Sequence, residues 1–352
     1  MKKKTSARLF TGIVVLLLVE ILFACSVNAN FTPLPELPTP IYIKEDGTIE
    51  GGAGALQRTG NVYTFVRDVD ETIEIQKDDV ILDGNGFTLT KPPEVNTVGR
   101  MTPIGWFPSI RISNRDNIII MNITFDKCYT GISVENSSNI IIIQNIIRNG
   151  AEGIYMSSAV NCSIIGNEII DHSSAGLNIM DSSFLNIAYN TISRNRGHGA
   201  WIAVSYSNIS RNDISYNTAP NVGIGLYLYG ANSHNIIFEN NFINNDIGLF
   251  YQGARGISVN NTVYSNYWSN YQDAIVNVAA DAASGVDQSP LTSPVSTSFD
   301  PSLFHLSSLE IAEFPSWIIL PLLITTTLLI LIYKKRLPKK HQNQKKSFIL
   351  GD

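Results

Sequence analysis

Four side chains near the middle of the chain are of types that could carry acid–base chemistry: Asp126, Asp171, Arg194 and His198. Two carboxylates can serve as the acid and the base of glycoside cleavage when they lie about 6.5 to 9.5 Å apart. A neighbouring guanidinium or imidazole can hold or transfer a proton in such a site. These residues form a candidate catalytic set only if the fold brings them together. The fold that the surrounding sequence predicts therefore determines whether they can form a site.

The surrounding sequence repeats. Seven segments such as IIIIQNIIR, CSIIGNEII and LNIAYNTIS superpose on one Asn each, with steps of 23, 22, 23, 22, 28 and 21 residues. The long step contains the insertion APNVGIG. One Asn at the same place in every repeat is typical of amide side chains that hydrogen-bond along a stack. The expected ladder consists of Asn122, Asn145, Asn167, Asn190, Asn212, Asn240 and Asn261.

A second segment of each repeat begins with Gly and then alternates, as in GISVE, GIYMS, GAWIA and GLYLY. This alternation predicts a short strand with one buried face, and its register defines two outward rows of side chains. Outward aromatic side chains spaced about 4.8 Å apart can pack against sugar rings, or they can stack with each other across strands. The candidate ligand-binding residues are Tyr155, Trp201, Tyr227, Tyr229 and Phe250.

Short β-rich segments at a fixed period, without a helical pattern, predict an all-β protein, and the Leu pattern of a leucine-rich repeat is absent. A single-stranded parallel β-helix fits, because each repeat can form one coil of short strands. We expect about nine coils of 21–23 residues each. Asp126 and Asp171 would then lie two coils apart, roughly 9 to 10 Å, with Arg194 one coil further and His198 nearby.

Residues 194–202, RNRGHGAWI, contain members of both candidate sites: Arg194 and His198 of the catalytic set and Trp201 of the ligand-binding set. Their Gly-His-Gly resembles the letter pattern at the active site of polygalacturonases, but no Asn-Thr-Asp precedes it and no Arg-Ile-Lys follows it. Gly199 belongs to the recurrent Gly at the strand starts. We interpret the stretch as a turn followed by an outward-facing Trp201.

The repeats, the segment VILDGNGFTL and the segment NYWSNY at 266–271 resemble a known group over about residues 40–290. This group comprises the right-handed parallel β-helix (pectin-lyase-like) proteins of the NosD-like, carbohydrate-binding and sugar-hydrolase kind. The resemblance implies a right-handed solenoid. It leaves the activity open, because such proteins include sugar-cleaving enzymes, binding modules and an accessory protein of copper-site maturation.

Bound metals have little support in the sequence. A copper site needs a compact His, Met or Cys cluster, whereas His172, His198 and His234 are scattered through the repeats. The resembling proteins continue after the repeats with an acidic Asp-Gly segment, of which QDAIVNVAADAASGVDQSP is a degenerate version. Calcium is the one ion to consider there, and we otherwise expect no cofactor and no metal site.

The ends of the chain carry export and anchoring signals. Residues 1–29 read as a signal peptide, although LFAC also resembles a lipobox ending at Cys25. We expect a membrane-spanning helix at 313–333, because the run from Phe314 to Tyr333 is uncharged, apolar and long enough to cross a bilayer. The basic residues 334–352 after it are typical of a cytoplasmic tail. Between them we expect an N-terminal cap at 30–55, the β-helix at 56–284 and a Ser/Pro/Thr-rich stalk at 285–312.

The charge balance limits the partners. The first 29 residues carry +3 and residues 334–352 carry +6, so the remaining chain has a net charge of −14 against −5 for the whole. An acidic domain of this kind argues against nucleic acid as a partner, since phosphate contacts need a basic surface.

These observations predict a single-pass membrane protein with an extracellular β-helix and a cytoplasmic tail. We expect the β-helix to bind carbohydrate or another surface polymer through the aromatic row. Two alternatives stay open. One is a polysaccharide lyase or glycoside hydrolase that acts through Asp126, Asp171, Arg194 and His198, and the other is a structural surface protein or a NosD-like, copper-related accessory protein.

Overall fold

The computed structural model describes residues 39–90, 108–253, 260–269, 275–277, 287 and 289–303. The predicted signal peptide, membrane-spanning segment and cytoplasmic tail lie outside these residues. Within them, no helix is long and apolar enough to cross a membrane. The chain divides into two compact units, residues 1–299 and 300–352, and the described part of the second unit contains a short 3₁₀ turn at Pro301–Leu303.

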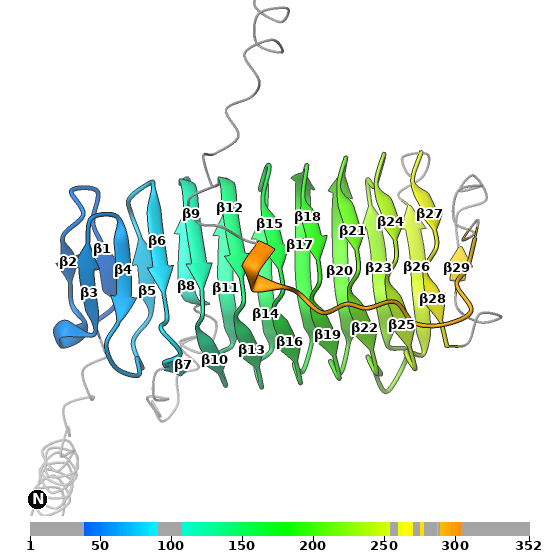
Figure 1. Cartoon of the computed structure of the whole chain (residues 1–352), viewed down its shortest axis with the longest axis horizontal. Coiled ribbons are helices and arrows are strands. Elements are labelled where there is room, and N and C mark those ends of the chain that lie inside the picture. The colour runs from blue at the N-terminus through cyan, green and yellow to red at the C-terminus, as the bar shows by residue number, and fades with distance from the viewer. Residues whose placement is uncertain are drawn as a thin grey trace, which may run out of the picture. The chain divides into compact units, whose positions relative to one another are not determined.

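The first unit is an all-β parallel solenoid, in which each coil contributes one short strand to each of three sheets (Figure 1). Strand pairs between successive coils are parallel throughout the repeats. Among the described residues the smallest sheet has eight strands, which corresponds to eight complete coils where the sequence predicts about nine. Residues 71–90 form the first complete coil.

The strands are numbered in chain order, and each belongs to one of the three sheets. The first sheet contains β2 (Ile49–Glu50), β1 (Ile41–Ile43), β5 (Ile73–Ile75), β8 (Pro108–Ser113), β11 (Thr130–Glu135), β14 (Glu152–Ser157), β17 (Ala175–Ser183), β20 (His198–Ser205), β23 (Ile224–Gly230), β26 (Ile247–Gly253) and β29 (Ile275–Asn277). The second contains β3 (Leu56–Thr59), β4 (Val62–Phe65), β6 (Val80–Asp83), β9 (Asp116–Met121), β12 (Ser138–Ile143), β15 (Ser163–Ile165), β18 (Asn186–Ala188), β21 (Asn208–Ser210), β24 (Ile236–Phe238) and β27 (Thr262–Tyr264). The third contains β7 (Thr88–Thr90), β10 (Thr124–Asp126), β13 (Ile146–Arg148), β16 (Glu168–Ile170), β19 (Thr191–Ser193), β22 (Asp213–Ser215), β25 (Asn241–Ile243) and β28 (Tyr267–Trp268).

The N-terminal end of the solenoid is closed by antiparallel pairs. β2 pairs with β1, which lies against the first coil, and the β3–β4 hairpin covers the second sheet in the same way. This cap extends to Phe65, further than the residue 55 expected from the sequence. Antiparallel closure protects the end of the stack, since an open edge strand would pair with another chain.

Apolar side chains fill the space between the three sheets. Ile132 and Val134 in one coil lie above Ile154 and Met156 in the next, and none of the four is exposed to solvent. β-Branched side chains are stiff and suit extended backbone, which is why Ile dominates these positions. The Gly at the strand starts is required by packing, because a Cβ at Gly199 would lie 2.5 Å from the carbonyl oxygen of Gly225.

Buried amides hold the corner between the second and third sheets. At each step the Asn side-chain oxygen accepts hydrogen bonds from the backbone N–H and the Nδ2 of the Asn one coil earlier, as Asn190 does from Asn167 at 2.9 and 3.0 Å. The Asn190 Nδ2 donates in turn to the Ile164 carbonyl and to Asn212. The ladder consists of Asn145, Asn167, Asn190, Asn212, Asn240 and Asn266.

Two members of the expected ladder lie elsewhere, which corrects the sequence alignment. In the coil of Asn122 the ladder position is held by Ile123, whose N–H donates to Asn145, while Asn122 occupies the preceding corner position with a positive φ of 56°. A one-residue shift of this kind moves a side chain to the other face. Asn261 belongs to a separate corner stack, where it accepts from Asn235.

A second buried ladder runs along the corner between the third and first sheets, through Asn195, Asn217 and Asn245. His172 takes the ladder position one coil before Asn195. Its N–H donates to Asn195 and its Nε2 lies 3.1 Å from the Ile147 carbonyl, while its buried Nδ1 has no partner among the described residues. Burial lowers the pKa of His172 from 6.5 to about 4.

The C-terminal end of the main ladder is a buried carboxylate. Asp287 Oδ2 accepts hydrogen bonds from the backbone N–H and the Nδ2 of Asn266 and from the indole N–H of Trp268, and Oδ1 accepts from the Ser289 N–H. Trp268 stacks on Phe242 in the core, with 4.3 Å between ring centroids. Asp287 therefore ends the ladder, and its oxygens are engaged by protein donors.

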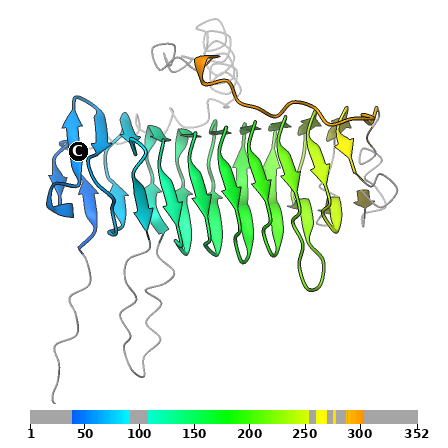
Figure 2. The same cartoon turned by 60° about the horizontal axis from the view of Figure 1, so that its bottom comes forward.

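Residues 289–299 run back along the solenoid from this end (Figure 2, orange). Leu291 N–H donates to Asn266, Asn241 exchanges two hydrogen bonds of 2.9 Å with Val295, and Phe299 packs against Tyr189. A Cβ at Gly166 would lie within 2.8 Å of the Phe299 ring. This part of the predicted stalk thus lies against the coils.

We predict that Asn190→Ala lowers the free energy of unfolding by about 3 kcal/mol or more, because each buried group that loses its partner costs about 1 to 3 kcal/mol. Denaturant unfolding measures this. The control is Asn208→Ala, an exposed residue of β21 without a side-chain hydrogen bond in the described residues, which should change stability by less than about 0.5 kcal/mol. Equal effects of the two changes would contradict the role of the ladder.

We also predict that His172→Asn removes an acid sensitivity of the fold. Between pH 6.5 and 4 the unfolded chain binds a proton that the folded His172 does not, so stability falls as pH falls through this window. The loss is about 3 kcal/mol for a single group shifted this far. Unfolding measured between pH 7 and pH 4 should show a shallower decline for the Asn variant, and identical profiles would contradict the assignment.

Candidate functional site

Five rings form one contiguous cluster on the outer face of the first sheet, at β20, β23 and β26. Trp201 and Tyr227 stack across neighbouring coils, with centroids 5.8 Å apart and planes 9° apart. Tyr229 meets both of them edge-on, and Phe250 meets Tyr227 at 5.1 Å. The aromatic cluster is completed by His198, whose ring lies edge-on to Trp201 and Tyr227.

The aromatic cluster is partly open to solvent. Tyr229 is 44% exposed, the other rings are half-buried, and the Tyr227 hydroxyl donates to the side-chain oxygen of Gln252. Burial lowers the pKa of His198, which disfavours the charged form of its ring. The sequence predicts four of these rings as ligand-binding residues, whereas it predicts His198 as a member of the candidate catalytic set.

Tyr155 lies apart from the aromatic cluster. It occupies the same outward row as Trp201, but Asn178 stands between them, one coil from each. Asn178 Nδ2 donates to Glu152 at 2.9 Å. On this side the indole of Trp201 therefore faces an amide instead of another ring.

Three buried polar atoms at this edge of the aromatic cluster have no hydrogen-bond partner in the described part of the chain: Trp201 Nε1, His198 Nδ1 and Asn178 Oδ1. Buried polar groups are nearly always paired, and an unpaired one costs about 1 to 3 kcal/mol. Three such atoms around one aromatic cluster are typical of a site that completes its hydrogen bonds with water or a ligand.

The Gly-His-Gly of residues 197–199 is explained by packing at both glycines. A Cβ at Gly197 would lie 2.3 Å from the Ser174 carbonyl oxygen, and Gly199 meets the next coil in the same way as the other strand-start glycines. The structure therefore supports the interpretation of RNRGHGAWI as a turn followed by an outward Trp201.

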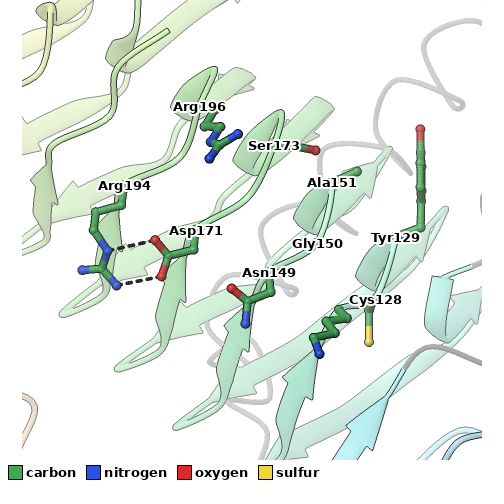
Figure 3. A pocket seen from close by; sticks show the side chains of 10 residues that line it. Cys128, Tyr129, Asn149, Gly150, Ala151, Asp171, Ser173, Arg194 and Arg196 are labelled. Carbon is green, nitrogen blue, oxygen red and sulfur yellow. Dashed lines mark hydrogen bonds and ion pairs between the residues drawn. The ribbon is translucent and has the colours of Figure 1, made fainter.

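A groove of about 620 Å³ lies along the corner between the third and first sheets, over the turns that lead into β11, β14, β17 and β20 (Figure 3). Gly150 and Ala151 are small residues in its lining. The basic groove, as we name it from its charges, is lined by Lys127, Cys128, Tyr129, Asn149, Gly150, Ala151, Asp171, Ser173, Arg194 and Arg196.

One ion pair lies in the basic groove. Arg194 donates from Nε and Nη2 to the two oxygens of Asp171, at 2.9 and 2.8 Å, from one coil to the next. The hydrogen bond to Arg194 holds the pKa of Asp171 below its usual range, and the same contact raises the pKa of Arg194. Asp171 is therefore a fixed carboxylate at neutral pH, and it is not a proton donor there.

The structure brings together only two of the four candidate catalytic residues, Asp171 and Arg194. Asp126 aligns with Arg148 on the neighbouring coil, one position before the row of Asp171, and it accepts from Arg148 and Asn149. It does not line the basic groove. His198 belongs to the aromatic cluster. The misplacement of Asp126 has the same cause as that of Asn122, a one-residue offset in this coil.

Two cations of the basic groove, Lys127 and Arg196, were not anticipated from the sequence. Both are exposed, and neither forms an ion pair with another described residue. With the correct register Lys127, Asn149, Asp171 and Arg194 stand in one row across four coils. The shift of register in one coil hides this row in the sequence.

We predict that Asp171→Asn lowers stability by less than about 1 kcal/mol, because both partners of its ion pair are substantially exposed and solvent screens them. Asp287→Asn is the contrasting change. It places an amide among buried donors of Asn266 and Trp268 and should cost about 2 kcal/mol or more. Denaturant unfolding of the two variants tests the ranking, and a larger loss for Asp171→Asn would contradict it.

Solved structures with a similar fold include a surface adhesin of Streptococcus pneumoniae, PfbA, at 18% identity and a TM-score of 0.43, with 58% of each chain covered. The periplasmic alginate epimerase AlgG is similar at 12% identity and a TM-score of 0.41, covering 69% of this chain and 80% of that one. DFA-IIIase from Arthrobacter chlorophenolicus A6 is similar at 11% identity and a TM-score of 0.34, covering 67% of this chain and 63% of that one. The chain spans less than two thirds of the length of the adhesin and of DFA-IIIase.

No curated protein matches the chain. A family model does: the model described as periplasmic copper-binding protein (NosD) matches residues 71–273, from the first complete coil to just beyond the eighth. The matched range is more than half of the chain and coincides with the repeats that carry the Asn ladder, the aromatic cluster and the basic groove. The chain therefore belongs to the NosD family.

Proposed function

We propose that this protein binds carbohydrate or a related surface polymer through the aromatic cluster. The observation that carries the proposal is the contiguous, partly exposed set of Trp201, Tyr227, Tyr229 and Phe250 on rigid neighbouring strands. Exposed apolar patches on a soluble domain usually mark interaction sites, and tyrosine and tryptophan present flat faces with a polar edge.

The contacts of the aromatic cluster suit a polyhydroxylated ligand. A sugar can pack against the solvent-exposed parts of these rings, of which Tyr229 is 44% exposed. Trp201 Nε1 would then supply a donor and Asn178 Oδ1 an acceptor for hydroxyl groups, and the role of His198 Nδ1 follows from its tautomer. These atoms lie below the surface, so binding requires a rotation of the half-buried rings.

An enzymatic role has weaker support. Lyase or hydrolase chemistry needs a base and an acid that converge on one bond, whereas Asp126 and His198 lie outside the basic groove and Asp171 is bound by Arg194. The geometry offers one ionised carboxylate and no partner acid among the candidates.

Copper, which the family description names, does not fit the described residues. They contain no group of three His, Cys, Asp or Glu side chains that could hold a metal ion. His172 is buried with its Nε2 at a carbonyl, and burial raises the pKa of the Cys128 and Cys162 thiols to about 11, which disfavours the thiolate that binds metal. We therefore base no step of the proposed function on copper.

The cellular setting belongs to the same proposal. The signal-like residues 1–29, the apolar stretch at 313–333 and the basic tail support an exported, membrane-anchored protein whose solenoid faces outward. In that setting a bound polymer would be held at the cell surface.

The test is retention of the full-length protein on a panel of polysaccharides, measured by affinity electrophoresis. A Trp201→Ala, Tyr227→Ala double variant should lose at least about tenfold in affinity, since two ring contacts are removed together. The matched control is Phe184→Ala, Tyr206→Ala, which removes another exposed stacked pair, 5.3 Å between centroids, on a different face. The control should bind as the unchanged protein does.

Two results would count against the proposal. One is unchanged retention of the Trp201→Ala, Tyr227→Ala variant, and the other is an equal loss in both double variants. Release of oligosaccharides that stops in Asp171→Asn would instead establish the enzymatic alternative.

A further inference from the structure

The basic groove has a surplus of positive charge. Lys127, Arg194 and Arg196 contribute three cations to its lining and Asp171 one anion, and only Arg194 among the three cations is paired with a carboxylate. Arg194 is fixed in direction by its two hydrogen bonds to Asp171. Unpaired exposed cations around a groove lined by small residues are suited to an anionic group.

This surplus stands out from the rest of the molecule. The chain has a net charge of −5, so a cationic groove is a local reversal of the overall charge. Three other arginines of the described surface have acidic partners: Arg148 contacts Asp126, Arg115 contacts Glu45, and Arg211 contacts Glu239. Arg58 and Arg111 are exposed without an ion pair among the described residues, but they do not line a groove with other cations. Lys127 and Arg196 lack such a partner within the described residues, which leaves their charges available.

The basic groove and the aromatic cluster adjoin each other. Arg194 and Arg196 lie in the turn that leads directly into β20, and His198 at the start of β20 contacts Trp201 and Tyr227. The basic groove covers the turns into β11, β14, β17 and β20, while the aromatic cluster continues over β20, β23 and β26. Successive coils are about 4.8 Å apart along the solenoid axis. The basic groove and the aromatic cluster lie one after the other along this axis, so together they are long enough to contact several sugar units of one chain.

From this juxtaposition we propose that the basic groove is a second binding surface, which takes the carboxylate groups of an acidic glycan whose sugar rings pack on the aromatic cluster. The inference rests on the proposed function and names its ligand class. Carboxylates spaced along a sugar chain suit guanidinium and ammonium groups spread over several coils. A densely charged nucleic acid suits the surface less well, because Asp171 and the acidic surroundings repel it.

The experiment compares two polymers that differ only in their carboxylates: polygalacturonate and the same polymer after chemical reduction of its carboxyl groups to alcohols. Binding of the full-length protein is measured for both by calorimetry at several salt concentrations. The groove variant is Lys127→Gln, Arg196→Gln, and the control is Arg211→Gln, an exposed arginine of another corner.

We expect the unchanged protein to prefer polygalacturonate. The groove variant should lose at least about tenfold in affinity for polygalacturonate and retain its affinity for the reduced polymer, since hydrogen bonds to charged groups are removed. Its binding should also depend less steeply on salt. Arg211→Gln should behave as the unchanged protein, and Trp201→Ala, Tyr227→Ala should weaken binding of both polymers.

Equal affinity of the unchanged protein for the two polymers would overturn the inference, as would an unaffected groove variant. Tighter binding to DNA than to polygalacturonate would overturn the assignment to a glycan. If the groove variant loses polygalacturonate while Trp201→Ala, Tyr227→Ala binds normally, the basic groove stands and the proposed role of the aromatic cluster fails. Binding of neither polymer would overturn both.

Discussion

The buried amide ladder is the constraint on which the rest of the molecule depends. Each Asn side chain joins one coil to the next and also satisfies backbone groups at a corner where the chain leaves one sheet for another. Without these bonds the corner would bury unpaired N–H and C=O groups at every coil. The ladder therefore fixes the place at which each coil bends, and Asp287 ends it with a carboxylate that accepts from four donors.

A fixed coil spacing turns sequence positions into rows on the surface. Equivalent residues of neighbouring coils face each other across about 4.8 Å, so Trp201 and Tyr227 stack and Asp171 meets Arg194 without any long-range loop to position them. Rows of this kind bind extended ligands well, because the spacing is set by backbone pairing and costs no further ordering on binding. The aromatic cluster and the basic groove are two such rows, and RNRGHGAWI is where they meet.

Much of this architecture could be predicted from the sequence, because the repeat is read directly from the Ile and Asn positions. The period, the strand-start Gly and the outward positions of Trp201, Tyr227 and Phe250 all depend on spacing alone. The errors at Asn122 and Asp126 have one origin. Asn122 and Asp126 were aligned by matching an Asn, whereas packing aligns Ile123 with Asn145, and nothing local in the sequence distinguishes the two registers.

Other features could not be predicted, because they depend on contacts between distant segments. The packing of Phe299 over Gly166 joins residues far apart in the chain, and the place of His172 in an Asn ladder requires the three-dimensional register. Lys127 and Arg196 have no motif around them and become a site only when four turns are stacked. Fold class thus follows from periodicity, while the composition of the surface sites follows from register.

The most direct test of the central claim is fluorine NMR of the protein labelled with 5-fluorotryptophan, titrated with an oligosaccharide from the polymer that it retains. Trp201 lies in the aromatic cluster, whereas Trp268 is buried on Phe242 and serves as the internal reference. Our account predicts that the Trp201 resonance, assigned with Trp201→Phe, shifts on saturation while that of Trp268 does not. Saturable binding that leaves the Trp201 resonance in place would contradict it.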